Sequence, residues 1–378
     1  MALVQFTNLR PHDLLVEDGR IVAGGTPDEV VDCDGLLALP APVDAHIHPD
    51  KTTWGQSWLS REPARNLREL IDGDVAARQG MTATVAERAG ALMDHAIARG
   101  ARAWRAHVDV APVYGLDNLH GVRQAAAERA HLLDVQTVAF PQLGLLTAPG
   151  TAELLERALQ EGADILGGLD PIGVDGDLHG HLDVLFGLAQ RHGVPLDIHL
   201  HDGGAAGVET VHEIARRTAA SGLKVTISHA FSLAGEVAPE TVKLLAEAGV
   251  ALTTCALGGD PVISPDTFAG TGVLLAAGSD GVRDPWTPFG DGDMIARAHL
   301  LAYRTDARTD EELAACYAVV AHGGAELLGL ARVELNPGDP ADFVLVRSDS
   351  VAQAVVERPI PHLVVRAGRV IARDGRLV

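Results

Sequence analysis

Eight short apolar segments, separated by longer amphipathic stretches, constrain the fold of this chain most strongly. They lie near residues 42–47, 102–108, 135–140, 164–169, 195–200, 224–229, 249–254 and 274–279. Such an alternation predicts an α/β protein in which parallel strands are joined by helical crossovers. Eight strands favour a closed (β/α)8 barrel of the TIM type over an open sheet. No Gly-x-Gly-x-x-Gly pattern follows the first strand, which argues against dinucleotide binding.

The two ends of the chain carry a different pattern, in which short β-type runs surround tight turns. Residues 12–32 contain two such runs around Asp18 and Gly19, and residues 341–346 and 363–378 repeat the arrangement. Because these turn residues predict hairpins, we expect both termini to meet in one small β-sandwich. The predicted domains are a sandwich of residues 1–40 and 332–378 and a catalytic barrel of residues 41–331. Independent hairpins are the alternative.

Charge and cysteine content limit the partners and the compartment. The chain has 51 acidic and 30 basic residues, a net charge of −21, which disfavours nucleic acid and anionic membrane as partners. No apolar run approaches the ~18 residues of a membrane span, and the first residues do not resemble a signal peptide. Three Cys without disulfide or metal-site spacing indicate a reducing, cytoplasmic location. The sequence leaves open whether the chain forms a homo-oligomer.

Residues able to bind a metal ion recur at the predicted carboxyl ends of the barrel strands. His46 and His48 follow the first strand two residues apart, so both can project from one face. His199 ends the fifth strand, His229 the sixth and Asp280 the eighth. Any one of them alone would more often be a packing residue. Because barrel enzymes place their chemistry at these ends, we expect the five to meet.

A metal ligand set follows from this group. Three imidazoles and one carboxylate, from His46, His48, His199 and Asp280, suit one zinc or ferrous ion and leave a position for water. A bound ion would lower the pKa of that water. His229 is expected to hold the nucleophile or the developing oxyanion rather than to bind the metal. Asp280 is counted as both ligand and catalytic residue.

In order and spacing these residues resemble the amidohydrolase superfamily, most closely its cytosine deaminase branch. The resemblance rests on the stretches DAHIH (44–48), AHVDV (106–110), VAFPQ (138–142), DIHLHD (197–202), ISH (227–229), GSD (278–280) and DPW (284–286). It implies a metal-dependent hydrolase acting on carbon–nitrogen bonds other than peptide bonds. Binuclear members carry a carboxylated Lys at the end of strand four. Here Asp170 lies in that region and no Lys occurs between positions 51 and 224, so the resemblance implies one metal ion.

The resemblance also implies substrate contacts. Gln142 matches a family Gln whose amide pairs with the lactam edge of a pyrimidine, and Trp286 resembles an aromatic residue that covers the ring. Lys51, in a stretch similar to that of enzymes removing alkylamino groups from triazine rings, could neutralise an anionic ring oxygen. Asp170 is a further candidate for substrate binding. The ordinary alternatives are a loop amide, a packing indole and a solvated amine.

Two positions depart from cytosine deaminases. Asp202 stands where they have a Glu that moves protons between the metal-bound water, the ring and the leaving amine. We expect Asp202 to take that role despite its shorter reach, with His201 as the next candidate. Gly281 replaces an acidic residue beside Asp280, which predicts a changed or enlarged pocket and a substrate other than cytosine.

The leading functional prediction is a hydrolase that removes an amino or substituted amino group from a small nitrogen heterocycle. The first alternative is a cyclic amide or lactam hydrolase on the same scaffold, whose product is an opened ring. The second is a non-catalytic homologue that binds a metal ion or a small molecule. The residues do not identify the substrate and do not distinguish zinc from iron.

Overall fold

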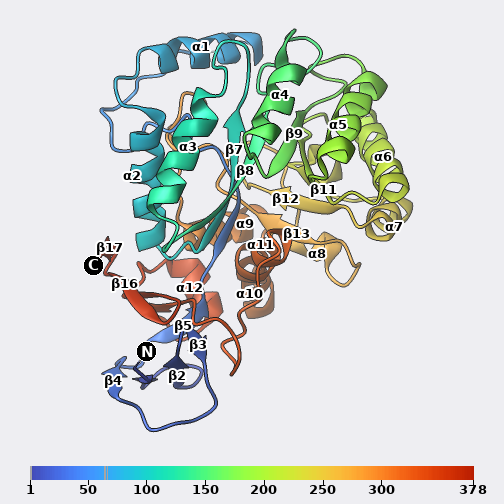
Figure 1. Ribbon diagram of the computed structural model, residues 1–378. Helices are drawn as coiled ribbons and strands as arrows, with labels where there is room; N and C mark the ends of the chain where they lie inside the picture. The colour runs from blue at the N-terminus through green and yellow to red at the C-terminus, as the bar shows by residue number, and fades with distance from the viewer. Residues whose placement is uncertain (1, 64, 66) are drawn as a thin grey trace.

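A computed structural model describes residues 2–63, 65 and 67–378 of the chain, with a parallel barrel at its centre (Figure 1). Its strands are β6 (Val43–Ile47), β7 (Ala103–Asp109), β8 (Asp134–Phe140), β9 (Ile165–Leu169), β10 (Leu196–His199), β11 (Val225–Ser228), β12 (Ala251–Thr254) and β13 (Leu275–Ala277). They pair in chain order, all parallel. The eight predicted strands are therefore confirmed.

The first and last strands meet and nearly close the barrel. Ile47 forms a parallel bridge with Asp280. The His48 amide donates to the Asp280 carbonyl at 3.2 Å, and the Asp280 amide donates to the His46 carbonyl at 2.8 Å. Gly278 allows this approach, because a Cβ there would lie 2.4 Å from the His46 carbonyl oxygen. The predicted (β/α)8 barrel is confirmed, and its closing contact lies among the expected metal ligands.

Helices surround the barrel and close one end of it. The outer helices are α2 (Val85–Ala98), α3 (Asp117–Glu128), α4 (Thr151–Gln160), α5 (Leu178–His192), α6 (Gly204–Ser221), α7 (Pro239–Ala248), α8 (Pro265–Phe268) and α9 (Met294–Arg304). Helix α10 (Asp310–Ala318), the π-helical turn η2 (Val319–Gly323) and α11 (Gly324–Leu327) follow. Gly323 and Gly324 lie against Leu275 and Val43, the first residues of β13 and β6. This segment therefore covers the amino ends of the strands.

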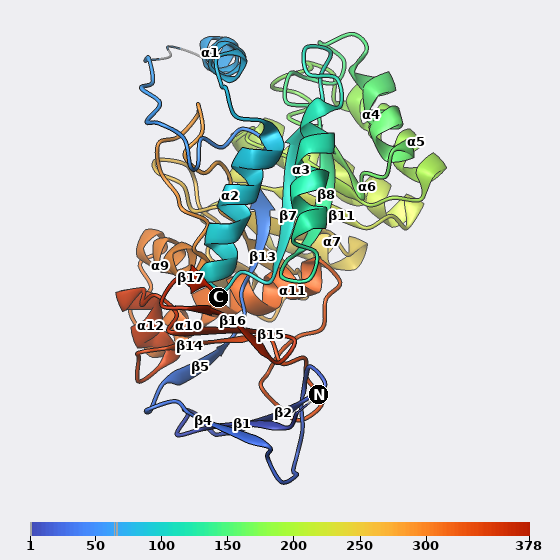
Figure 2. The ribbon, with the colours of Figure 1, turned by 60° about the vertical axis from the view of Figure 1, so that its left-hand side comes forward.

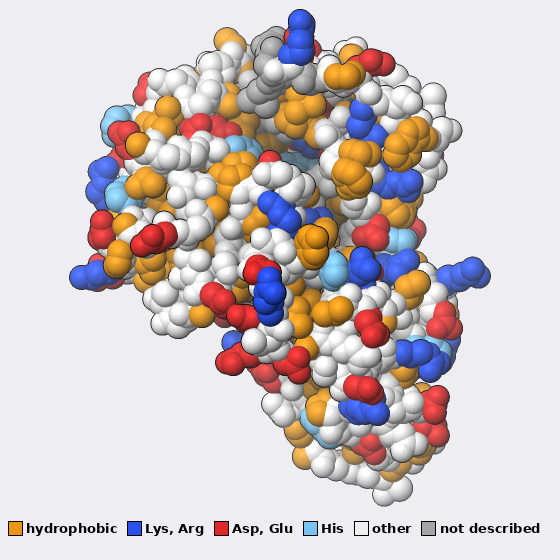
Figure 3. Space-filling view, turned by 180° about the vertical axis from the view of Figure 1, so that it is seen from behind, with side chains coloured by type: hydrophobic (Ala, Val, Ile, Leu, Met, Phe, Trp, Pro, Cys, Tyr) orange, Lys and Arg blue, Asp and Glu red, His pale blue; other side chains and the backbone are white. Residues whose placement is uncertain are grey.

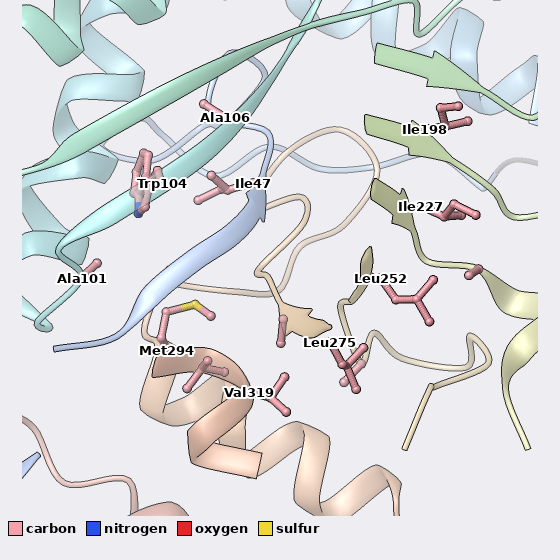
Figure 4. Close-up of a cluster of buried hydrophobic side chains, with 14 of the residues drawn as sticks. Ile47, Ala101, Trp104, Ala106, Ile198, Ile227, Leu252, Leu275, Met294 and Val319 are labelled. Atoms are coloured by element: carbon pink, nitrogen blue, oxygen red, sulfur yellow. The ribbon is translucent and has the colours of Figure 1, made fainter. Parts of the chain in front are cut away.

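Buried apolar side chains pack between the barrel strands and the surrounding helices (Figure 4). Ile47, Trp104 and Ile198 are fully buried in this layer, and Met294 and Val319 come from the helical segment below. Inside the barrel, Arg105 of β7 instead donates to Asp197 of β10 and Thr226 of β11. Because Arg105 also donates to the Leu327 carbonyl of α11, the amino end of the barrel is occupied and covered, and space for a bound molecule is left at the carboxyl ends of the strands, as in other barrels of this type.

Two mainly antiparallel sheets form the end of the molecule that lies away from the carboxyl ends of the barrel strands (Figure 2). The first has the order β3-β2-β1-β4 and consists of β1 (Val4–Thr7), β2 (Leu14–Glu17), β3 (Arg20–Ile21) and β4 (Glu29–Asp32). The second has the order β17-β16-β15-β14-β5, with β5 (Leu37–Pro40), β14 (Phe343–Val346), β15 (Leu363–Arg366), β16 (Arg369–Arg373) and β17 (Arg376–Leu377). Phe6 comes from the first sheet and Phe343 from the second. Their rings pack edge to face between the two sheets, with the ring centroids 5.3 Å apart. The predicted sandwich from both termini is confirmed.

The predicted turn at Asp18 and Gly19 joins β2 to β3, and both residues have positive φ (49° and 78°), as a two-residue hairpin requires. Helix α12 (Val351–Glu357) follows β14 and packs on α9 and α10. The domain boundaries at 40/41 and 331/332 stay a prediction.

On the face drawn in Figure 3, acidic, basic and apolar side chains are interspersed. Among the described residues, no helix combines the length and apolarity needed to cross a membrane.

Candidate metal centre and active site

The four predicted metal ligands converge at the carboxyl end of the barrel. The Nε2 atoms of His46 and His48 lie 3.3 Å apart, and those of His48 and His199 lie 3.2 Å apart. Asp280 Oδ1 lies 3.3 Å from His48 Nε2 and 3.7 Å from His46 Nε2. A shift of register in β6 between Asp44 and Ile47 accompanies this placement of the two histidines.

These separations fit ligands of one tetrahedral ion. Two nitrogens each 2.0–2.1 Å from zinc at a tetrahedral angle are about 3.3 Å apart, close to the spacing found here. The three imidazoles are at most 3% exposed, so their ring nitrogens are shielded from solvent. Three neutral nitrogens and one carboxylate suit zinc or ferrous iron. The residues present therefore fit the metal that the sequence predicts.

A chain of hydrogen bonds that begins at Nδ1 orients the His46 ring. Its Nδ1 lies 2.9 Å from the Ser228 hydroxyl, and that hydroxyl donates to Asp197 Oδ1 at 2.6 Å. Arg105 donates to Asp197 Oδ2 at 2.9 Å. Burial raises the pKa of the Asp197 carboxyl, and Arg105 opposes that shift. Such partners fix the orientation of a ligand imidazole. No role was predicted for Ser228 or Asp197, although both lie in motif stretches.

His107 is a third buried residue for which no role was predicted. Its ring stacks on that of His46, with the centroids 3.9 Å apart, and it is fully buried. Neither of its ring nitrogens has a hydrogen-bond partner. It occupies the carboxyl half of β7, so the AHVDV stretch was the signal that could have placed it beside the ligands.

His229 lies beside the ligand cluster, as expected. Its ring centroid is 4.9 Å from that of His46 and 5.1 Å from that of His199. Its Nε2 is buried without a hydrogen-bond partner. Burial lowers the pKa of His229 to about 3. A neutral imidazole with an unused nitrogen facing this cluster is able to exchange a hydrogen bond with a bound molecule.

Three strand ends at the site have strained backbone. Asp170, His229 and Asp280 have φ of 35°, 69° and 60°, in a region that residues with a Cβ seldom occupy. Strain of this kind persists where the surrounding structure enforces it, and it concentrates at functional sites. At these three positions the backbone turns sharply after the strand, so that the side chain stays at the carboxyl end of the barrel.

The predicted substrate residues Lys51, Gln142 and Trp286 meet at one side of the site. Lys51 Nζ donates to Gln142 Oε1 at 2.7 Å and lies 5.6 Å from the centre of the Trp286 ring. Lys51 and Gln142 are buried, so the solvated alternative for Lys51 does not hold. An ammonium, an amide and an indole together suit a flat ring that bears oxygen atoms.

Asp170, His201 and Asp202 form a group at the other side. Asp170 Oδ2 lies 2.7 Å from His201 Nδ1, and the His201 ring is 4.4 Å from that of His229. Asp202 Oδ2 instead accepts the Gly173 amide at 2.9 Å, which ties it to the loop after β9. Burial would lower the pKa of His201, but its hydrogen bond and charge interaction with Asp170 raise it overall. The two candidate proton carriers thus have different surroundings.

The structure corrects the expectation for Gly281. A Cβ at this position would lie 2.3 Å from Asp284 Oδ2, so the space that Gly281 leaves is filled by Asp284 and does not enlarge the pocket. The other oxygen, Oδ1, accepts the amides of Trp286 and Thr287, both at 2.8 Å, which holds the carboxyl in place. Burial raises the pKa of Asp284 to about 6.

Comparison with known proteins agrees with this geometry. Residues 61–372 match the sequence profile of the Amidohydrolase family. The chain is 32% identical over 372 residues to the N-isopropylammelide isopropyl amidohydrolase of Pseudomonas sp. strain ADP, covering 94% of this chain and 90% of that protein. It is 29% identical over 397 residues to the pterin deaminase of Rhizobium rhizogenes, covering 96% and 88%.

A solved structure is similar over the whole length. The N-isopropylammelide isopropylaminohydrolase of Burkholderia multivorans superposes with a TM-score of 0.94 and 39% identity, covering 100% of each chain. The sequence-based prediction of a hydrolase acting on carbon–nitrogen bonds is confirmed by these relatives. On this profile match and this near full-length similarity, the chain belongs to the amidohydrolase family.

Proposed function

We propose that this protein uses one divalent metal ion, zinc or ferrous iron, to replace an amino or alkylamino group on an oxo-substituted nitrogen heterocycle with hydroxyl. The observation that carries the proposal is the position of Lys51, Gln142 and Trp286 beside the cluster of His46, His48, His199 and Asp280. N-alkylated ammelide is the favoured substrate class, because two relatives with that named activity cover at least 90% of this chain.

Two of the candidate roles concern binding of the ring. Gln142 presents an amide to the lactam edge, and the Lys51 ammonium offers a charge to an adjacent ring oxygen. The Trp286 indole lies near Lys51 and covers the flat face. Asp284, held by the amides of Trp286 and Thr287, fixes the turn that carries the indole.

The remaining roles concern proton transfer. When bound, a divalent ion supplies a Lewis acid and a water molecule of lowered pKa. We assign the proton carried to the leaving amine to His201 Nε2, because Asp170 holds its Nδ1 and its ring lies beside His229. Spacing along the sequence favours Asp202 instead, but its carboxylate is engaged by the Gly173 amide. His229 is available to hydrogen-bond the substrate or the water.

The test is product identity with metal-loaded protein and N-isopropylammelide, with cytosine and pterin as comparison substrates. We expect isopropylamine release with an intact ring, detected by derivatised amine chromatography and mass spectrometry. An opened ring would support the alternative, a cyclic amide hydrolase. Neither the Pseudomonas relative nor the Rhizobium relative is named for that activity. Release of neither isopropylamine from N-isopropylammelide nor ammonia from cytosine or pterin would refute the proposal.

A matched pair of variants tests the ring contacts. Gln142→Ala should raise KM roughly 5- to 150-fold, since an unpaired lactam edge in a buried site costs ~1–3 kcal/mol. Gln124→Ala is the control, because Gln124 lies on α3 and pairs with the exposed Glu128. An equal effect of both substitutions would remove Gln142 from the binding site. We also propose a cytoplasmic location, consistent with three Cys that are all buried and unpaired.

A further inference from the structure

A cation from outside the barrel strands reaches the edge of the active site. Arg78 lies near the end of helix α1 (Leu67–Gln79), which Figures 1 and 2 draw at the end of the molecule opposite the terminal sheets. Its NH1 lies 2.6 Å from Asp109 Oδ2 and its NH2 lies 3.1 Å from Asp50 Oδ2. The guanidinium also stacks over the Tyr114 ring at 4.2 Å, and its side chain is 5% exposed. A charge buried to this degree has a specific partner.

That partner connects Arg78 to Lys51. Asp109, at the end of β7, is fully buried and uses one oxygen for each cation. Its Oδ2 binds Arg78, and its Oδ1 lies 3.4 Å from Lys51 Nζ. Lys51 in turn donates to Gln142, so one carboxylate stands between helix α1 and the residues assigned to the ring.

The charges around Asp109 explain why Arg78 matters to this arrangement. Asp50, Asp74 and Asp109 are buried together around two cations, Lys51 and Arg78. Asp50 also accepts the Asp109 amide at 3.2 Å, so these two carboxylates are neighbours. Neighbouring buried carboxylates repel each other unless a cation faces both or one takes a proton. Without Arg78, Lys51 would be drawn toward the unbalanced carboxylates and away from Gln142.

We propose that Arg78 is a positioning residue: docked on Asp109 and Asp50, it fixes Lys51 so that the ammonium meets an oxygen of the substrate ring. Helix α1 is then part of the binding site although Arg78 itself contacts no reacting atom. The inference rests on the proposed function only in the identity of the ring. It assigns Arg78 to recognition of ring oxygen and not to the reaction step.

The test compares Arg78→Met, Arg78→Lys and the control Arg65→Met. Arg65 lies just before the same helix but pairs with Glu69 in a largely exposed position. With N-isopropylammelide, Arg78→Met should raise KM roughly 10- to 100-fold, the effect of a lost charged hydrogen bond, with kcat within about threefold. Arg78→Lys should restore part of the loss, and so should methylguanidinium added to Arg78→Ala, whose short side chain leaves room for it. A fall in kcat at unchanged KM, or no recovery with either, overturns the proposal.

A double-mutant cycle shows whether Arg78 acts through Lys51. In a Lys51→Met background, adding Arg78→Met should leave KM unchanged within about twofold, because the group it positions is gone. Independent, additive effects would contradict the inference. Melting temperature and metal content are measured for each variant, and Asp109→Asn repeats the cycle if Arg78→Met does not fold.

A binding measurement separates this inference from the proposed reaction. Cyanuric acid, a ring with three oxygens, is titrated into metal-loaded wild type and variants by calorimetry, which needs no turnover. We expect Arg78→Met to weaken binding roughly 10- to 100-fold and Arg65→Met to leave it unchanged. If wild type binds this probe but releases no amine, the reaction is wrong and the positioning role stands. If wild type does not bind it, Lys51 receives no ring oxygen and the inference fails.

Discussion

Replacing His201 should reduce turnover far more than replacing its neighbour Asp202. The spacing of the sequence favours Asp202 as the proton carrier, whereas the side-chain contacts favour His201. Asp170 holds His201 at Nδ1 with a distance of 2.7 Å, and this leaves Nε2 to exchange a proton. Asp202 is bound to a backbone amide of the loop after β9. Replacing His201 therefore removes a ring nitrogen that can exchange a proton, whereas replacing Asp202 changes a carboxylate that binds a backbone amide.

The expected sizes follow from those contacts. Loss of a positioned acid or base costs 10²–10⁴ in rate, so His201→Gln should lower kcat by about that factor, or ~2.7–5.4 kcal/mol of activation free energy. Asp202→Asn removes the charge from one 2.9 Å hydrogen bond at a partly exposed carboxylate. The Asn amide oxygen can still accept the Gly173 amide, so the bond is weakened by about 1 kcal/mol and not lost, and kcat should change no more than about fivefold. The two variants should differ at least 20-fold.

The assay is steady-state release of isopropylamine by enzymes whose metal content has been matched. Asp170→Asn should fall close to His201→Gln, and the double variant should be no worse than either, because residues that act as one unit are not additive. If Asp202→Asn loses 100-fold or more while His201→Gln keeps a third of wild-type turnover, the geometric argument is refuted. Asp202 would then be the proton carrier.

Three further predictions concern the metal and the stability of the fold. Elemental analysis should find one divalent ion per chain; a second equivalent would contradict the single ligand set. Ser228→Ala should weaken metal binding by roughly 10- to 100-fold in chelator competition, because it releases His46 Nδ1 from the Asp197 chain; unchanged affinity would show that the chain does not orient the ligand. Burial, with Asp291 adding to it, raises the pKa of Asp293 from 3.8 to about 6, so the folded state binds a proton more tightly than the unfolded chain. The contribution of Asp293 to the free energy of unfolding therefore falls as pH rises from about 4 to 6. Asp293→Asn, which keeps a cap for α9, should match wild type at pH 4 and be up to roughly 3 kcal/mol more stable at pH 8; denaturant melts that show no pH-dependent difference would refute this.

The sequence alone was sufficient for the barrel, the sandwich and the grouping of the expected metal ligands. Strand periodicity and length define β6 to β13 because a parallel strand buried on both faces reads as a short apolar run. Once eight such strands are placed, the rule that their carboxyl ends share one rim brings His46, His48, His199 and Asp280 together. Lys51, Gln142 and Trp286 also met as predicted, because each follows a strand of that rim.

What only the tertiary structure decided is how side chains pair across that rim. Arg78 and Asp109 lie 31 positions apart on a helix and a strand, and no pattern in the chain links them. Gly281 predicted open space, but the turn that follows folds Asp284 back into it. His201 and Asp202 are adjacent in sequence and have different partners. Their roles depend on rotamers and loop paths, which are set by packing between distant segments and not by local residue pattern.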